Sequence, residues 1–254
     1  MLLAIDIGNT NIGFGVFSGK RLIKRFNIPT QKYTIRNLRS SLGKITIDDS
    51  IICSVVPKVS GVLKDDLKKL FHKKPYCLGE DIKVPIKNLY LKPKQLGQDR
   101  LINAYAAATI YGYPVIVVDF GTAVTFNVIS KNKEYLGGMI FPGLQISLDA
   151  LAKRTALLPK IKLNNPREFI GRDTKSSMLG GIVYGFAALT DKLSEKIKAK
   201  IGKKTNVVGT GGDIQLIGKY CKRLDKIDRD LTLKGLNMIY CNSQDKKILL
   251  TKRK

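Results

Sequence analysis

Two short motifs, each an acid followed by small and hydroxyl residues, could bind phosphate groups and cations. The first is Asp6-Ile-Gly-Asn-Thr10 and the second is Asp119-Phe-Gly-Thr122, and each follows a hydrophobic run. Glycine lets a backbone approach a ligand closely, and successive amides with a hydroxyl present donors to phosphate oxygens. A carboxylate at the end of a strand can hold a divalent cation that bridges those phosphates. A β-hairpin in which Asn and Gly only supply positive φ explains the first motif equally well.

Two further clusters could complete such a site. Gly209-Thr-Gly-Gly-Asp213 follows an expected strand, and its bare backbone could lie against a nucleotide base or ribose. Taken alone, this cluster is better explained as a helix start capped by Asp213. In Gly97-Gln-Asp-Arg100, Asp99 could accept a hydroxyl proton and Arg100 could clamp an anion. An acid at that place could also simply complement a helix dipole.

The sequence offers few histidines and cysteines that could act in catalysis or bind a metal. The one histidine, His72, lies beside lysines in an expected amphipathic helix, which is typical of a surface residue. The four cysteines show no CxxC spacing and no neighbouring histidine, so free thiols in a reducing cytosol are expected. We therefore predict a cytoplasmic protein, since there is also no basic leader and no apolar run of about 18 residues to span a membrane.

The elements that must position these motifs repeat along the chain. In the first half the apolar pattern predicts strands over 2–8, 12–18, 22–28 and 51–56, and helices over 33–43, 59–72 and 98–111. In the second half it predicts strands over 115–121, 124–130, 134–140 and 206–209, and helices over 143–152, 176–201 and 231–240. Residues 246–254 are expected to form a frayed basic tail.

The two acid motifs stand 113 residues apart, at equivalent points of the two halves. A duplicated α/β unit of this kind predicts two similar domains, residues 1–113 and 114–254, facing each other across a nucleotide cleft. One Asp-x-Gly-Thr sequence is common in turns, whereas two at equivalent positions favour a shared phosphate-binding role.

Six motifs in order resemble the type III pantothenate kinase family: Asp6-x-Gly-Asn-Thr10, Ser54-Val-Val-Pro57, Gly97-x-Asp-Arg100, Asp119-x-Gly-Thr122, Gly137-Gly-x-Ile-x-Pro-Gly143 and Gly171-x-x-Thr174. The resemblance runs from Met1 to Tyr240, nearly the whole chain. It implies duplicated actin/hexokinase-like (ribonuclease H-like) domains and ATP-dependent phosphorylation of the primary hydroxyl of pantothenate. The product would be 4′-phosphopantothenate, in the first step of coenzyme A biosynthesis. The resemblance also implies a homodimer with its site near the subunit interface.

The same resemblance implies a role for individual residues. Asp99 would be the proton acceptor, Asp119 would hold K⁺ or NH₄⁺, and Asp6 would lie close to Mg²⁺. The residues implied to bind ATP are Asp6, Ile7, Gly8, Asn9, Thr10, Asn11, Ile12, Gly13 and Thr122. Those implied to bind pantothenate are Tyr90, Gly97, Gln98, Asp99, Arg100 and Thr174.

Two residues depart from the pattern of this family. The second motif of the family often reads Asp-x-Gly-Thr-Ala-Thr-Thr-x-Asp, whereas this chain has Val124 and Asn127 at two of those positions. Val124 lacks a hydroxyl, and Asn127 lacks a carboxylate that could arrange cations. We interpret both as tuning of activity, because Asp6, Asp99 and Asp119 are all present.

The charge of the chain suggests a rival class of function. Lys and Arg number 45 against 20 Asp and Glu, a net charge of +25 that would favour nucleic acid through counterion release. The lysines are spread along the chain and no helix-turn-helix, zinc finger or RNA-binding aromatic motif is present, so no specific nucleic-acid partner is expected. A non-catalytic regulatory relative (a transcriptional accessory factor) and another small-molecule kinase of the same superfamily remain alternatives. A regulator could lose Asp99, whereas a kinase needs it.

Overall fold

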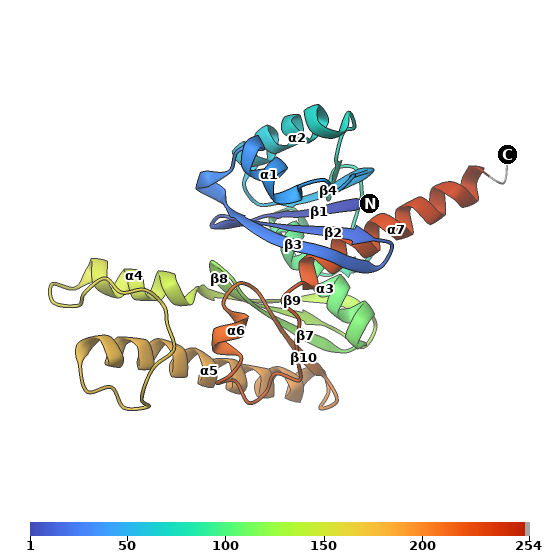
Figure 1. The fold of residues 1–254 in the computed structure, drawn as a ribbon. Coiled ribbons are helices and arrows are strands. Elements are labelled where there is room, and N and C mark those ends of the chain that lie inside the picture. Colours follow the sequence, from blue (N-terminus) through green and yellow to red (C-terminus); the bar gives the residue numbers. More distant parts are fainter. Residues whose placement is uncertain (252–254) are drawn as a thin grey trace. The chain divides into compact units, whose positions relative to one another are not determined.

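Alternating apolar residues build two mixed β-sheets, one in each of two structural units (Figure 1). This computed structural model describes the backbone of residues 1–251 and the side chains of residues 1–244. The first unit contains residues 1–86, 92–106 and the segment from Leu231 onward, and the second contains residues 87–91 and 107–230.

The sheet of the first unit has the strand order β3-β2-β1-β4-β5. Its strands are β1 (Leu2–Ile7), β2 (Asn11–Ser18), β3 (Arg21–Pro29), β4 (Asp49–Ser54) and β5 (Tyr76–Cys77). Its helices are α1 (Ile35–Leu42), α2 (Pro57–Phe71), the first part of α3 (Gln98–Tyr111) and α7 (Leu231–Thr251), with short 3-10 turns at Thr30–Lys32 and Pro93–Gln95. Strand β1 runs antiparallel to β2 and parallel to β4.

Helices cover both faces of this sheet because successive side chains of β1 point to opposite sides. Ile5 and its odd-numbered neighbours pack against α1 and α2 through residues such as Leu38 and Leu63. Ala4 and its even-numbered neighbours belong to a second cluster with Ile102 of α3 and with α7 (Figure 1). Asp6 continues this even-numbered series at the end of β1.

The sheet of the second unit has the order β11-β10-β7-β8-β9-β6. Its strands are β6 (Lys87–Asn88), β7 (Val115–Phe120), β8 (Ala123–Ile129), β9 (Glu134–Pro142), β10 (Asn206–Thr210) and β11 (Lys226–Ile227). Its helices are α4 (Leu144–Arg154), α5 (Thr174–Ile201), the single turn α6 (Ile214–Ile217) and the end of α3. Val183, Ala187 and Ile197 of α5 are buried in one core cluster with residues of β7 and β8.

Four strands have the same arrangement in both units. The order β3-β2-β1-β4 corresponds to β9-β8-β7-β10, with two antiparallel pairs followed by a parallel one. The structure therefore contains the duplicated α/β pattern that the two acid motifs predict.

The structural units differ from a division at residue 113 in three segments, the first of which is residues 107–113 in the second unit. Helix α7 belongs to the first unit, because Leu233, Leu236 and Ile239 are buried in a cluster with side chains of that unit. Residues 87–91 belong to the second unit, because β6 pairs with β9. Packing and strand pairing, rather than chain order, decide which unit α7 and residues 87–91 belong to.

The predicted strands and long helices lie where the apolar pattern places them, to within a few residues. Helix α7 is longer than the predicted 231–240 and continues to Thr251, so the backbone is helical where a frayed tail was expected; residues 252–254 lie outside the described part. Among the described residues, none of the helices combines the length and apolar character that a bilayer crossing needs.

Candidate active site

The turn between β1 and β2 carries the first acid motif. The Gly8 N–H donates to the Asn11 carbonyl at 3.1 Å, and the Thr30 hydroxyl donates to the Gly8 carbonyl at 2.7 Å. Thr30 also donates its N–H to the Thr10 carbonyl at 3.0 Å. Neither Gly8, Asn9 nor Thr10 has a positive φ. The hairpin explanation based on positive φ is therefore wrong, whereas exposed Asn9 and Thr10 remain accessible to a ligand.

Asp6 and Asp99 lie near one buried thiol in the first unit. The parallel pairing of β1 with β4 sets Asp6 beside Cys53, which is completely buried. Burial, followed by the negative charges of Asp6 and Asp99, raises the pKa of the Cys53 thiol well above its usual range. The thiol is thus neutral, and the structure gathers the predicted Mg²⁺ neighbour and the predicted proton acceptor around it.

Asp99 lies in the first turn of α3. Its Oδ1 accepts a hydrogen bond from the Arg100 N–H at 2.9 Å, and a side chain on Gly97 would collide with this same oxygen. Burial raises the pKa of Asp99, while the Arg100 N–H and guanidinium act in the opposite direction. Gly97 thus leaves room for a carboxyl that binds a proton more tightly than an exposed one. Arg100 itself is 8% exposed.

The turn between β7 and β8 carries the second acid motif, in the second unit. The Gly143 N–H donates to the Thr122 carbonyl at 3.1 Å, and a Cβ on Gly143 would lie 2.7 Å from the Gly121 carbonyl oxygen. Gly211, with φ +99°, approaches from β10, and its Cβ would lie 2.5 Å from Asp119 Oδ1. Only glycine fits at Gly143 and Gly211, because backbone from two other segments packs directly on this turn.

The Gly209–Asp213 cluster lies against the end of β7. The Asp213 N–H donates to the Phe120 carbonyl at 3.0 Å. Asp213 is the N-cap residue of α6, as the helix-start interpretation predicts, but its side chain makes no capping hydrogen bond. Burial alone raises the pKa of the Asp213 carboxyl. The cluster is thus part of the surroundings of the second motif.

The remaining predicted substrate residues lie on two other elements of the second unit. The ring of Tyr90 lies 6.3 Å from that of Tyr135, and its N–H donates to Asn88 Oδ1 at 2.9 Å. Thr174 is the exposed first residue of α5, directly after Asp173, whose side chain forms a capping box with Ser176. The structure thus gives Tyr90 a packed position and Thr174 an exposed one.

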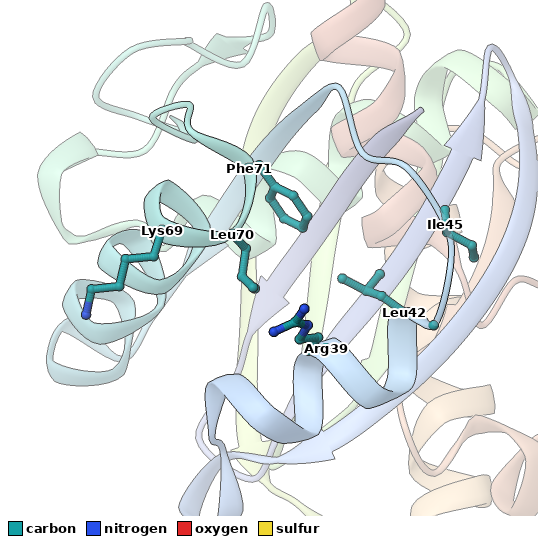
Figure 2. Close-up of a pocket in the computed structure, with 7 residues that line it drawn as sticks. Arg39, Leu42, Ile45, Lys69, Leu70 and Phe71 are labelled. Atoms are coloured by element: carbon teal, nitrogen blue, oxygen red, sulfur yellow. The ribbon is translucent and has the colours of Figure 1, made fainter.

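A surface cavity of about 280 Å³ lies in the first unit (Figure 2). It is lined by Arg39, Leu42, Gly43, Ile45, Lys69, Leu70 and Phe71. These residues come from the C-terminal parts of α1 and α2 and the loop after α1, and none is a predicted site residue. Because the lining shares no residue with the candidate active site, the cavity is separate from that site.

The acids of the site suit cations that are bound partly by other ligands. Among the described residues, no group of three or more His, Cys, Asp or Glu could hold a metal by itself. Mg²⁺ in kinases is usually bound by one or two carboxylates together with substrate phosphates and water, which fits Asp6. Asp119 stands beside the backbone of Gly211, and a carboxylate is an oxygen ligand that suits a hard cation.

Comparison with known proteins identifies the family. The family model described as type III pantothenate kinase matches residues 2–196. The type III pantothenate kinase of Finegoldia magna is 42% identical over 252 residues, covering 94% of this chain and 96% of that protein. That of Halalkalibacterium halodurans is 40% identical over 250 residues, covering 94% and 98%. The chain belongs to the type III pantothenate kinase family.

Solved structures with low sequence identity to this chain have a similar fold. A Baf family transcriptional activator from Campylobacter jejuni matches with a TM-score of 0.59 and 22% identity, covering 96% of this chain and 99% of that one. The activator of the 2-hydroxyisocaproyl-CoA dehydratase from Clostridium difficile matches with a TM-score of 0.56 and 11% identity, covering 98% and 97%. At this identity the likeness shows the fold alone, and it confirms the predicted actin/hexokinase-like class.

Sequence reasoning missed three residues that shape the site. Cys53 belongs to a hydrophobic run, and only its register opposite Asp6 reveals its position. Tyr135 resembles any other aromatic core residue until its hydroxyl is seen to donate to Asn127. Gly211 belongs to a noted glycine cluster, but the sequence does not show that it approaches Asp119. All three depend on contacts between strands.

Proposed function

We propose that three carboxylates divide the work of a pantothenate kinase in this chain. Asp99 accepts the proton of the substrate hydroxyl, Asp6 lies close to Mg²⁺, and Asp119 holds K⁺ or NH₄⁺. The overall reaction follows from the family: the chain uses ATP to phosphorylate the primary hydroxyl of pantothenate, giving 4′-phosphopantothenate for coenzyme A biosynthesis.

The observation that carries the role of Asp99 is its partly buried carboxyl above Gly97. Phosphoryl transfer depends mainly on positioning and charge neutralisation, so a carboxylate suffices as proton acceptor. Burial raises the pKa of Asp99, which makes its carboxylate a stronger base than that of a fully exposed aspartate. This retained acid favours a kinase over a non-catalytic regulatory relative.

The ATP phosphates would be held by residues 6–13 and Thr122. The exposed residues Asn9 and Thr10 of the β1–β2 turn support this role, since amide and hydroxyl groups are good donors to phosphate oxygens. When bound, Mg²⁺ and the monovalent cation neutralise charge on the phosphates. Asp6 and Asp119, at the ends of β1 and β7, would hold those cations.

Pantothenate would be held by Gly97, Gln98, Asp99 and Arg100, together with Tyr90 and Thr174. Arg100 is a buried cation beside the proton acceptor, and Gln98 packs against Gly79. Tyr90 offers a ring and a hydroxyl, and Thr174 an exposed hydroxyl. Hydroxyl and amide groups of this kind suit a substrate with hydroxyl, amide and carboxylate groups.

We also propose that the protein is a cytoplasmic homodimer. Three large apolar side chains of the second unit are unusually exposed: Leu157 at 92%, Ile170 at 77% and Phe169 at 74%. Such side chains are typical of surfaces covered by a partner, and a second copy of the chain is the occupant we propose. Sedimentation equilibrium should then give about twice the chain mass of 28.2 kDa. No disulfide joins the four cysteines, all of which lie in the described part, and reduced thiols are usual in cytoplasm.

The variant Asp99→Asn tests the proposed base. It keeps the shape of the side chain and removes its proton affinity, so kcat should fall by about 10²- to 10⁴-fold while the KM for ATP changes little. In the wild type, kcat/KM should also fall as the pH is lowered through the raised pKa of Asp99, because the protonated acid cannot accept a proton.

Steady-state rates of 4′-phosphopantothenate formation check both statements. The exposed acid Asp65 provides a matched control, because Asp65→Asn on α2 should leave kcat unchanged. A kcat for Asp99→Asn close to that of the wild type would exclude Asp99 as the base.

A further inference from the structure

We propose that Tyr135 is a positioning residue for the substrate contact at Tyr90, and that the buried amide of Asn127 holds it in place. This inference rests on the role of Tyr90 in pantothenate binding proposed above. It concerns residues that contact neither ATP nor pantothenate in that proposal and instead act through the ring of Tyr90.

A chain of buried and half-buried polar contacts runs along β8 and across to β9. The Tyr135 hydroxyl donates to Asn127 Oδ1 at 2.9 Å, and Asn127 Nδ2 donates to the Thr125 hydroxyl at 3.1 Å. Tyr135 and Asn127 are both completely buried. A buried polar group without its partner is costly, so these bonds fix the ring of Tyr135 in one orientation. Thr125 pairs with Asp119 across β7 and β8, which connects the chain of contacts to the second acid motif.

Tyr135 also contacts the segment that carries Tyr90, residues 87–91. Its carbonyl accepts the Leu89 N–H at 2.9 Å, and β6 pairs with β9 through Asn88 opposite Tyr135. The ring of Tyr90 packs against that of Tyr135 at 6.3 Å between centroids, with 55° between the planes. One residue thus contacts the backbone of the segment through its main chain and the ring of Tyr90 through its side chain.

The other contacts of the segment leave the ring of Tyr90 dependent on Tyr135. Lys87 forms an ion pair with Glu134 at 2.7 Å, which holds the far end of the segment. Gly137 of β9, at φ +132°, lies next to Tyr90 and has no side chain; an added Cβ would lie 3.9 Å from the Tyr90 ring. Leu91, the next residue, is fully exposed. Among the described residues, the aromatic ring that packs against Tyr90 is that of Tyr135.

This arrangement gives Asn127 a specific task. An amide can accept from Tyr135 and donate to Thr125 at the same time, without placing a charge in the core. A carboxylate at this position would still accept from Tyr135, and the Thr125 hydroxyl would then have to donate to it. The departure at Asn127 is therefore compatible with an ordered Tyr135, since the acceptor that Tyr135 needs is kept.

The test is a double-mutant cycle between Tyr90→Ala and Tyr135→Phe, measured by kcat and by the KM values for pantothenate and ATP. Tyr135→Phe keeps the ring and removes its anchor, so the KM for pantothenate should rise about 3- to 10-fold, the range expected for losing an oriented aromatic contact. The KM for ATP should stay within about 2-fold, and Tyr135→Phe should add almost nothing in the Tyr90→Ala background.

Each outcome of the cycle decides a different point. If Tyr90→Ala leaves the KM for pantothenate unchanged, the proposed role of Tyr90 fails and the positioning proposal fails with it. If Tyr90→Ala raises this KM but Tyr135→Phe does not, or if the two effects multiply, Tyr90 binds substrate and the positioning proposal alone is overturned.

Two further comparisons separate positioning from plain stability. Tyr111→Phe removes another tyrosine hydrogen bond of the same unit, to Asp228 Oδ2 at 2.9 Å, and should lower thermal stability without changing the KM for pantothenate. Asn127→Leu should reproduce the KM shift of Tyr135→Phe, whereas Asn127→Asp keeps the acceptor and should give a smaller shift. Equal shifts in the KM for pantothenate for Asn127→Leu and Asn127→Asp would contradict the proposal. The two Asn127 variants also provide an independent test if Tyr135→Phe folds poorly.

Discussion

The two acid-bearing turns of this protein have the same backbone arrangement but different surroundings. Asp6 and Asp119 are each the second-last residue of a first strand, and each strand runs antiparallel to its successor. Each acid also faces a parallel fourth strand, at Cys53 in one unit and at Thr210 in the other. The duplicated fold thus presents a carboxylate at the same point twice.

The neighbours of the two acids differ in polarity and space. Asp6 lies beside the buried thiol of Cys53 and shares it with Asp99, while Asn9 and Thr10 of its turn are exposed. The turn of Asp119 is covered by the glycine backbones at Gly143 and Gly211. A repeated scaffold therefore fixes where an acid stands, whereas the segments that pack around each turn decide what the acid can bind.

Among the substitutions that test this difference between the two turns, Asp6→Asn should have the largest effect on activity. Asp6→Asn removes the charge that we place close to Mg²⁺, so kcat/KM should fall by about 10²- to 10³-fold, as when one electrostatic contact to a transition state is lost. The Mg²⁺ concentration needed for half-maximal rate should rise at the same time.

A Mg²⁺ titration of initial rates measures this prediction. Asp49→Asn is a suitable control, because Asp49 begins β4 at the opposite end of the same sheet and accepts from the Tyr240 hydroxyl. It should affect stability and leave the Mg²⁺ dependence alone. A Mg²⁺ dependence of Asp6→Asn that equals the wild type would mean that the first turn has another task.

Smaller effects, on the free energy of unfolding, should show how tightly each of the two turns is packed. Gly143→Ala would push a methyl group into the Thr122 and Gly121 carbonyls and should cost about 1–3 kcal/mol of unfolding free energy. Gly8→Ala meets only the Asn11 carbonyl, at 3.1 Å, and should cost less. Gly185→Ala in α5 has open space and should be stabilising by about 0.4–1 kcal/mol.

Urea denaturation of the three variants provides the comparison. Similar losses for Gly143→Ala and Gly8→Ala would show that the second turn is no more tightly enclosed than the first. A loss for Gly185→Ala would mean that helix α5 has packing that the structure does not show.

Most of the fold could be predicted from local pattern because the core strands are strongly apolar. Strands β1, β7 and β10 are bounded by glycine or polar turns, and the long helices have apolar residues at helical spacing. The short elements β11 and α6 could not be predicted, since two to four residues carry no periodicity. Helix α7 extends beyond the predicted end, and its membership of the first unit depends on tertiary packing.

The candidate site divides in a similar way. The acids were found from sequence because a carboxylate next to Gly and Thr after a strand is a visible local pattern. Cys53, Tyr135 and the collision of Gly211 with Asp119 depend on strand register and on segments far apart in the chain. The sequence predicts Asp213 at the start of a helix, but it does not reveal that the side chain of this N-cap residue makes no capping bond.

The most direct test of the division of labour between the two turns is the monovalent cation dependence of 4′-phosphopantothenate formation. Wild-type protein and Asp119→Asn would be assayed with ATP and Mg²⁺ in K⁺, in NH₄⁺ and in Na⁺ at equal ionic strength. We predict that the wild type is active in K⁺ and NH₄⁺ and much less active in Na⁺, while Asp119→Asn is slow in all three. A wild type indifferent to the cation, or an Asp119→Asn variant that keeps the K⁺ response, would contradict the role of the second turn.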